Sequence, residues 1–227
     1  MSKVGQAATG GPGAGRTSPL VSVVVAAFNA ADFIEETCRS VIQQTYSAWE
    51  LIVVDDGSTD GTGDIVQSLV RSDPRLRLIR QRNGGVAAAR NAGIAAASGG
   101  FLCVLDADDL WDPTKIERQL RRLQEAGPGA GFAYCWWAWV DVNGLVLDRS
   151  PRWRVEGAVL EKLVEINFTG NTSVPLFRRA YVEDHDRTSE NCRDQTLRKT
   201  GQFNWTSSAG SFTSAPELER RVGRNRR

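Results

Sequence analysis

The sequence predicts an α/β fold built on a mostly parallel sheet with helices on both faces. Short runs rich in Val, Ile and Leu alternate with longer segments whose apolar residues recur every three or four positions, from Pro19 to about residue 125. The short runs are apolar throughout, which is typical of strands buried on both faces. Strict alternation of strand and helix makes neighbouring strands parallel, because each helix returns the chain to the edge where the previous strand began.

Each element of this first half follows from its local pattern. Strands are expected at 20–27, 51–54, 76–79 and 101–105. Helices are expected at 32–45, around 65–70, at 86–97, and in a segment that places Ile116, Leu120 and Leu123 on one face. Asp112 and Pro113 are expected to open this last helix as its cap and its first residue.

The chain changes character after residue 130. Two short strands are expected within 131–148, joined by a turn at Asp141–Gly144 that contains an Asn-Gly pair typical of hairpins. A helix is expected at 157–166 and a strand at 172–177. Beyond Glu183 the sequence becomes polar, and it ends in an arginine-rich tail at 206–227.

Composition places the chain among ordinary globular proteins. The net charge of +1 argues neither for nor against a nucleic-acid partner, and we expect none. The four cysteines form no CxxC pair, so buried free thiols and a reducing, cytoplasmic setting are expected. Residues 1–18 contain no apolar segment and are expected to form a flexible leader rather than a signal peptide. No apolar run approaches the roughly 20 residues of a transmembrane helix, and peripheral contact with a membrane stays open.

Two aspartates at the end of the fourth expected strand are the sharpest chemical feature. Asp106 and Asp108 are two positions apart in extended chain, so their carboxylates point the same way and lie close together. Two like charges in that position are costly unless a cation neutralises them. Hard oxygen ligands suit Mg²⁺ or Mn²⁺, which proteins usually hold through one or two carboxylates and the phosphates of a substrate. We therefore expect a divalent metal at this strand end.

Polar residues also follow the other three strands, and all of them are expected at the same edge of the sheet, where open α/β folds bind ligands. The second strand is followed by Asp55 and Asp56, in a loop too acidic to hold phosphates. A carboxylate there can accept a hydrogen bond from a nucleobase imide or a ribose hydroxyl. Ser58, Thr59 and Asp60 are better explained by local turn chemistry.

Four segments together resemble family 2 glycosyltransferases of the GT-A type, which are inverting enzymes. They are Ser22–Asn29 (SVVVAAFN), Val53–Asp60 (VVDDGSTD), Asn83–Asn91 (NGGVAAARN) and Leu105–Asp109 (LDADD). Their order and spacing match the family across residues 20–125. One departure is visible: the family usually has a proline before the first aromatic residue, and here Ala26-Ala27-Phe28 stands instead.

The resemblance implies a function and a set of site residues. The protein would move a sugar from a nucleoside diphosphate, UDP or dTDP, to an acceptor hydroxyl in polysaccharide or glycoconjugate synthesis. The implied donor-binding residues are Ala27, Phe28, Asn29, Asp55 or Asp56, Asn83, Arg90 and Asp106, with Asp108 on the metal. The implied organisation is a leader at 1–18, a nucleotide-sugar-binding part at 19–130, an acceptor-side part at 131–205, and the tail at 206–227.

The catalytic base implied by the resemblance is less well marked. Asp194 lies at the distance from Asp108 at which the family places its base, but Arg193 stands where the family usually has Glu. Asp184 and Asp186 are rivals for the role, and all three acids are equally compatible with a solvated polar segment. The acceptor, whether a sugar, a lipid-linked glycan or a protein, is not indicated by the sequence.

Two alternatives stay open at this point. The LDADD segment also resembles the nucleophile loop of haloacid-dehalogenase-like phosphatases, although that loop normally follows the first strand of its fold and here follows the fourth. The chain is also compatible with a nucleotide-sugar-binding relic that binds a donor without turnover.

Overall fold

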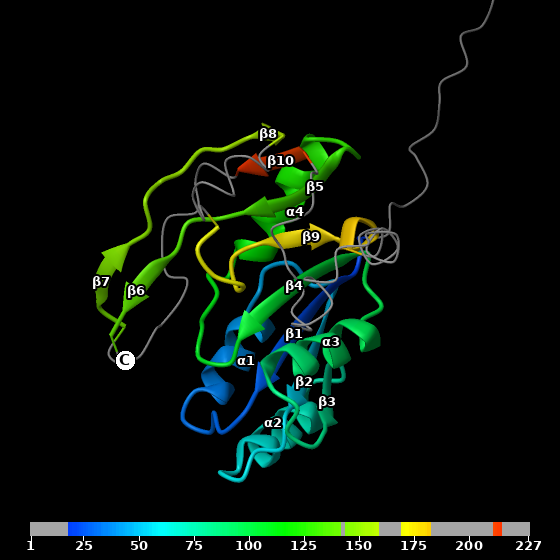
Figure 1. Cartoon of the computed structure of the whole chain (residues 1–227), viewed down its shortest axis with the longest axis vertical. Coiled ribbons are helices and arrows are strands. Elements are labelled where there is room, and N and C mark those ends of the chain that lie inside the picture. The colour runs from blue at the N-terminus through cyan, green and yellow to red at the C-terminus, as the bar shows by residue number, and fades with distance from the viewer. Residues whose placement is uncertain (1–17, 142–143, 159–168, 183–210, 215–227) are drawn as a thin grey trace, which may run out of the picture.

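The computed structural model describes residues 18–141, 144–158, 169–182 and 211–214, and these residues form one mixed sheet with helices on both faces (Figure 1). Within them the main sheet has eight strands in the order β3-β2-β1-β4-β9-β5-β10-β8. Its first half consists of parallel strands at Val21–Ala27 (β1), Trp49–Asp55 (β2), Leu76–Arg80 (β3) and Phe101–Asp106 (β4). The predicted α/β fold with a mostly parallel sheet is confirmed for this half.

Two hydrophobic clusters hold the helices against the sheet. The helices are Ile34–Ile42 (α1), Thr62–Ser72 (α2), Val86–Ala96 (α3) and Lys115–Glu125 (α4). Residues of α1, α2 and α4 pack with Val23 and Val25 of β1, whereas Ala89 of α3 packs with Val24, which points to the other face. This alternation along a single strand is why a continuous apolar run is needed when both faces are covered.

The second half of the chain extends the same sheet. Strands β5 (Ala130–Tyr134) and β9 (Leu176–Arg178) are antiparallel to each other, and β9 lies between β4 and β5. Ser211–Ser214 (β10) pairs with β5 on one side and with Gly157–Ala158 (β8), the edge strand, on the other, and β10 is a strand that the polar sequence of the tail did not predict. A separate hairpin, Ala138–Val140 (β6) and Val146–Arg149 (β7), projects at one side of the molecule (Figure 1).

Three expected elements differ in the structure. Helix α4 begins at Lys115, because the Asp112 carboxylate accepts hydrogen bonds from the backbone N–H (2.9 Å) and the hydroxyl (2.7 Å) of Thr114 and so closes a turn before the helix. The strand expected at 172–177 is confined to Leu176–Arg178, and Thr172 and Ser173 form a turn. The helix expected at 157–166 was wrong at its start, where β8 lies, and its remainder falls outside the described residues.

The predicted turn at Asp141–Gly144 is confirmed at the ends that the structure describes. The Gly144 N–H donates to the Asp141 carbonyl (3.0 Å), and Gly144 has a φ of 81°. Cys38, Cys103 and Cys135 are buried free thiols, as expected, and burial raises the pKa of Cys38 to about 12. Cys192, the leader at 1–17 and most of the tail lie outside the described residues. None of the helices formed by the described part of the chain is long and apolar enough to cross a membrane.

Candidate active site

The loops that follow β1 and β2 are joined by hydrogen bonds at the carboxyl edge of the sheet. The Asp56 N–H donates to the Ala27 carbonyl (2.8 Å), and the Asn29 N–H donates to the Ser58 hydroxyl (3.0 Å). The Ala30 and Ala31 N–H groups donate to Thr62 and Asp60. The Asp60 carboxylate also accepts from the N–H and the hydroxyl of Thr62, which is the local turn chemistry expected for this segment. The two loops therefore form one rigid rim.

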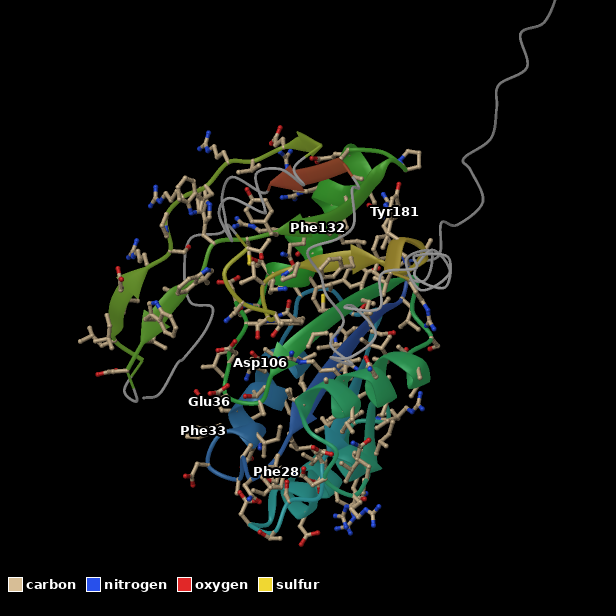
Figure 2. The ribbon with its side chains drawn as sticks, viewed as in Figure 1. Phe28, Phe33, Glu36, Asp106, Phe132 and Tyr181 are labelled. Atoms are coloured by element: carbon tan, nitrogen blue, oxygen red, sulfur yellow. The ribbon has the colours of Figure 1, made fainter. Side chains whose placement is uncertain are left out.

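Phe28 and Asn29 project from this rim. Phe28 is 51% exposed, an unusual position for a phenylalanine at the end of a buried strand (Figure 2). Asn29 has a φ of 49°, a left-handed conformation that few non-glycine residues adopt. Its side-chain oxygen accepts a hydrogen bond from the Thr59 N–H (2.9 Å), which holds that conformation. Ala27, just before them, is buried in the core, so of these three residues Phe28 is the one with a face free for a planar ligand.

Asp55 and Asp56 are both buried, but their surroundings differ. The Asp55 carboxylate accepts a hydrogen bond from the Ser58 N–H (3.0 Å). The Asp56 carboxylate accepts three, from the Gln81 side chain (2.7 Å) and from the N–H groups of Gly84 (2.9 Å) and Gly85 (2.8 Å). Burial raises the pKa of Asp56, but these hydrogen bonds outweigh it and hold the pKa below its ordinary value. Asp56 is thus an anchor for the loop after β3 that is ionised at neutral pH.

The loop after β3 brings Asn83 to the same rim. Asn83 is exposed, and its backbone lies so close to Gly57 that a Cβ on Gly57 would come within 3.0 Å of the Asn83 nitrogen. Gly57 also has a φ of 80°, so glycine is required here on both counts. The structure therefore places Asn83 beside the loop that carries Asp55 and Asp56.

The loop after β4 carries the acidic cluster. Asp106 is partly exposed and forms an ion pair with Arg90 of α3, with 2.7 Å between Nη2 and Oδ1. Burial and the nearby charge of Asp106 raise the pKa of Asp108, and no side chain among the described residues donates a hydrogen bond to it. Asp109 is buried. Burial, together with the charges of Asp106 and Asp108, raises its pKa to about 7 despite hydrogen bonds from Ser173 and Asn171.

The acidic cluster fits a divalent cation that is completed by a ligand. Within the described residues, no group of three or more His, Cys, Asp or Glu side chains is placed to hold a metal ion by itself. Asp108 nevertheless offers hard oxygen atoms in a setting that penalises its negative charge, and such an arrangement suits Mg²⁺ or Mn²⁺ with phosphate oxygens as the remaining ligands. The buried Nε of Arg90 also has no hydrogen-bond partner in the described part of the chain, which leaves a donor at this site.

The segment Asn171–Ser173 belongs to the site and was missed by sequence reasoning. Its three side chains are hydrogen-bonded to the loop after β4. The predicted donor-site residues lie at the ends of strands or follow them, whereas this segment precedes β9. Because β9 is antiparallel to β4, its amino end lies at the carboxyl edge of β4. The sequence signal that could have identified this segment is a short polar cluster directly before an apolar strand.

Most of the predicted site residues come together at this edge of the sheet, and three predicted acids cannot be located because they lie outside the described residues. Phe28, Asn29, Asp55, Asp56, Asn83, Arg90, Asp106 and Asp108 all lie on or next to the loops described above. Asp194 and its rivals Asp184 and Asp186 lie outside the described residues.

The parallel half of the sheet, with polar and acidic loops at its carboxyl edge, places the chain among the open α/β proteins, which bind their ligands at that edge. The chain belongs to glycosyl transferase family 2, whose family model matches residues 22–184. The family assignment does not support the phosphatase alternative.

Relatives of known name agree with this assignment. The putative teichuronic acid biosynthesis glycosyltransferase TuaG of Bacillus subtilis is 39% identical over 132 residues, which are 58% of this chain and 52% of that protein. The chondroitin synthase of Pasteurella multocida is 37% identical over 105 residues, 46% of this chain and 11% of that protein. The chain therefore spans about half the length, or less, of these curated relatives.

Solved structures show the same GT-A fold. S. aureus TarS 1-349 in complex with UDP superposes with a TM-score of 0.62 at 21% identity, covering 86% of this chain and 60% of that chain. The mannosyltransferase PcManGT of Pyrobaculum calidifontis, in complex with GDP-Man and Mn2+, has a TM-score of 0.55 at 23% identity, covering 74% of this chain and 47% of that chain.

Proposed function

We propose that this chain provides the donor site of a metal-dependent, inverting glycosyltransferase that moves a sugar from UDP or dTDP to an acceptor hydroxyl. The observation that carries the proposal is the convergence of strand-end loops at one edge, with Asp55 and Asp56 at the end of β2, Phe28 after the neighbouring β1, and the Asp106–Asp109 cluster at the end of β4 on the other side of β1 (Figure 2). A nucleoside diphosphate has a planar base at one end and phosphates at the other, so its base would lie against the loops after β2 and β1 and its phosphates beside the acids after β4.

The base would stack on Phe28, and its imide N–H would donate to Asp55 or Asp56. Asp56 remains a candidate although it already accepts three hydrogen bonds, because an ionised carboxylate offers about four acceptor positions. A uracil or thymine ring offers the required N–H. Guanine offers one as well, and since the relative PcManGT was solved with GDP-Man, GDP is the main competitor. The UDP bound in the TarS complex supports the pyrimidine assignment.

The ribose and the diphosphate would lie at the other end. Asp106 would accept a hydrogen bond from a ribose hydroxyl, and Asp108 would hold Mn²⁺ or Mg²⁺. When bound, the cation offsets the negative charge that develops on the leaving diphosphate. Arg90 lies beside Asp106, and its unpaired Nε is a donor for the same ligand. Asn29 would line the rim beside Phe28, and Asn83 would line it beside the loop that carries Asp55 and Asp56.

Transfer with inversion needs a base for the acceptor hydroxyl. In a single displacement the hydroxyl oxygen attacks the anomeric carbon, the bond to the diphosphate breaks, and a carboxylate takes the hydroxyl proton. From its spacing we assign this role to Asp194. The names of TuaG and chondroitin synthase point to polysaccharide synthesis. The acceptor is otherwise open, and the buried free thiols favour a cytoplasmic setting.

Calorimetric titration with nucleoside diphosphates tests the proposal. Wild-type protein should bind UDP or dTDP more tightly than GDP or ADP, and binding should require Mn²⁺ or Mg²⁺. Asp108→Ala should abolish the metal-dependent binding without lowering the thermal unfolding midpoint, because a partly exposed strand-end acid does not hold the core.

Glu125→Ala is the matched control, since Glu125 is an exposed acid at the end of α4 that runs away from the site. Unchanged metal-dependent affinity in Asp108→Ala would refute the metal assignment, and tighter binding of GDP would refute the base assignment. Donor binding with no transfer to any acceptor would favour the relic alternative.

A further inference from the structure

The turn before β9 and the acidic loop after β4 are connected at three points. The Thr172 hydroxyl lies 3.0 Å from Oδ1 and 3.1 Å from Oδ2 of Asp106. The Asp106 N–H donates to the Ser173 hydroxyl (3.0 Å), and the Asn171 amide donates to the Asp109 carboxylate (3.0 Å). Three consecutive side chains thus hold both acids and the backbone of the loop.

This turn is itself firmly anchored. Ser173 is fully buried, and its carbonyl accepts a hydrogen bond from the Trp111 indole (2.9 Å). The next carbonyl, that of Val174, accepts from the buried Gln119 side chain of α4 (2.8 Å). A hydroxyl on such a support is preorganised, since it loses little conformational freedom when it orients a partner.

Thr172 also completes the environment of Arg90. The same Nη2 of Arg90 lies 2.7 Å from Asp106 Oδ1 and 3.1 Å from the Thr172 hydroxyl. Asp106, Arg90 and Thr172 therefore form a closed triangle of side chains from β4, α3 and the turn before β9. Repulsion from Asp108 and Asp109 would otherwise drive the Asp106 carboxylate away from the cluster. Two donors on Asp106 offset this repulsion and fix the direction of its carboxylate.

We infer that Thr172 is a positioning residue of the donor site: its hydroxyl holds the Asp106 carboxylate in the orientation that receives the donor. The inference rests on the proposed function, because it assigns to Asp106 a contact with a nucleoside diphosphate. Thr172 acts through Asp106 and Arg90 and need not touch the donor. Thr172 comes from the second half of the chain, whereas the residues proposed to contact the donor belong to the first half.

Binding of UDP in the presence of MnCl₂, measured by calorimetry on the full chain, tests this inference. Thr172→Val keeps the shape of the side chain and removes the hydroxyl, and should weaken binding about 10-fold or more, the expected effect of losing a hydrogen bond to a charged group. Thr172→Ser keeps the hydroxyl and should restore affinity to within about 3-fold of wild type.

The control is Thr45→Val. Thr45 lies between α1 and β2, at the edge where the strands begin, and its hydroxyl donates to the Glu117 carboxylate (2.6 Å), so this variant also removes a hydroxyl bonded to a carboxylate. This variant should bind UDP like wild type. If the role of Thr172 is purely structural, Thr172→Val should have a lower thermal midpoint but unchanged UDP affinity in the folded protein. That result would overturn the inference and leave the proposed function standing. If wild-type protein binds no nucleoside diphosphate, the proposed function fails, and the inference fails with it.

Discussion

At the scale of single residues, the site separates acids that hold the protein together from acids that are left for a ligand. Asp56 is surrounded by three donors from the loop after β3, whereas Asp108 receives no side-chain hydrogen bond among the described residues. The two carboxylates are both strand-end acids in the sequence, and only the number of donors around each one distinguishes them. Removal of Asp56 should therefore cost stability, and removal of Asp108 should cost binding.

Asp56→Asn should lower the free energy of unfolding by about 2 kcal/mol, because a neutral amide oxygen replaces the buried, charged acceptor of three hydrogen bonds. The pKa of Asp56 is lower in the folded protein than its ordinary value, so its contribution is fully present above that value and is lost as the pH falls through the folded pKa. Urea unfolding of both proteins at pH 7 and at about pH 3 measures this effect. The difference between them should shrink at the lower pH; an equal difference at both would contradict the assignment.

The residues predicted from the sequence were those whose position follows from the chemistry of a parallel strand end. Asp106 and Asp108 were placed correctly at the carboxyl edge, because any residue after a parallel strand lies there. Thr172 could not be placed in this way, since its position depends on β9 entering the sheet in the opposite direction. Asp112 was predicted to cap the helix because aspartate is a common cap residue, but its carboxylate closes the turn that precedes α4.

At the scale of elements, α3 lies unusually close to the sheet. Gly93 of α3 is buried, and a Cβ at this position would overlap the Val24 side chain of β1 and come within 3.2 Å of Val54. The close approach brings Arg90, one turn earlier on the same helix, to within ion-pairing distance of Asp106. The strands and helices of this half were predictable because their apolar patterns are long. The strands β8 and β10 have two and four residues and too few apolar positions to show a period.

Gly93→Ala should destabilise the fold by about 1–3 kcal/mol, the usual cost of overpacking a core. Without a clash, replacing glycine by alanine in a helix should stabilise the protein by about 1 kcal/mol. A loss of stability would therefore indicate the clash with Val24. Val24 is buried and β-branched, which leaves it little freedom to move aside. Gly100→Ala is the control, since no atom lies within 4 Å of the added methyl group. Thermal unfolding of the two variants decides the point, and a stabilised Gly93→Ala would contradict the close packing.

At the scale of the whole molecule, the donor site depends on both halves of the chain. The segment expected to lie on the acceptor side supplies three of the described strands of the main sheet, β5, β8 and β9, and the turn that holds the acidic loop. The base assigned by spacing lies further along, outside the described residues. Its position in the fold could not be predicted from the sequence, because the residues after Glu183 have no apolar periodicity that would indicate a helix or a strand.

Asp194→Asn should reduce sugar transfer at least ~100-fold, the lower end for general-base catalysis, and leave donor affinity nearly unchanged. The neighbouring Arg193 sits about 100° away if this segment is helical, so it need not weaken the base. Transfer rates with a panel of acceptors, measured beside UDP affinity, separate the two effects. The matched variants Asp184→Asn and Asp186→Asn serve as comparisons. Full activity of Asp194→Asn would show that Asp194 is not the base and make Asp184 or Asp186 the next candidate.

The insertion of β9 between β4 and β5 also has a consequence for the order in which the protein is made. Strand β4 is synthesised long before the residues that pair with its outer edge, because Phe101 is opposite Arg178. Until the ribosome has released that later segment, the nascent chain exposes an unpaired strand edge of the kind that invites aggregation. Pairings so distant in sequence form slowly. The proposed donor site is therefore assembled late in biosynthesis, although nearly all of the residues proposed for it emerge early.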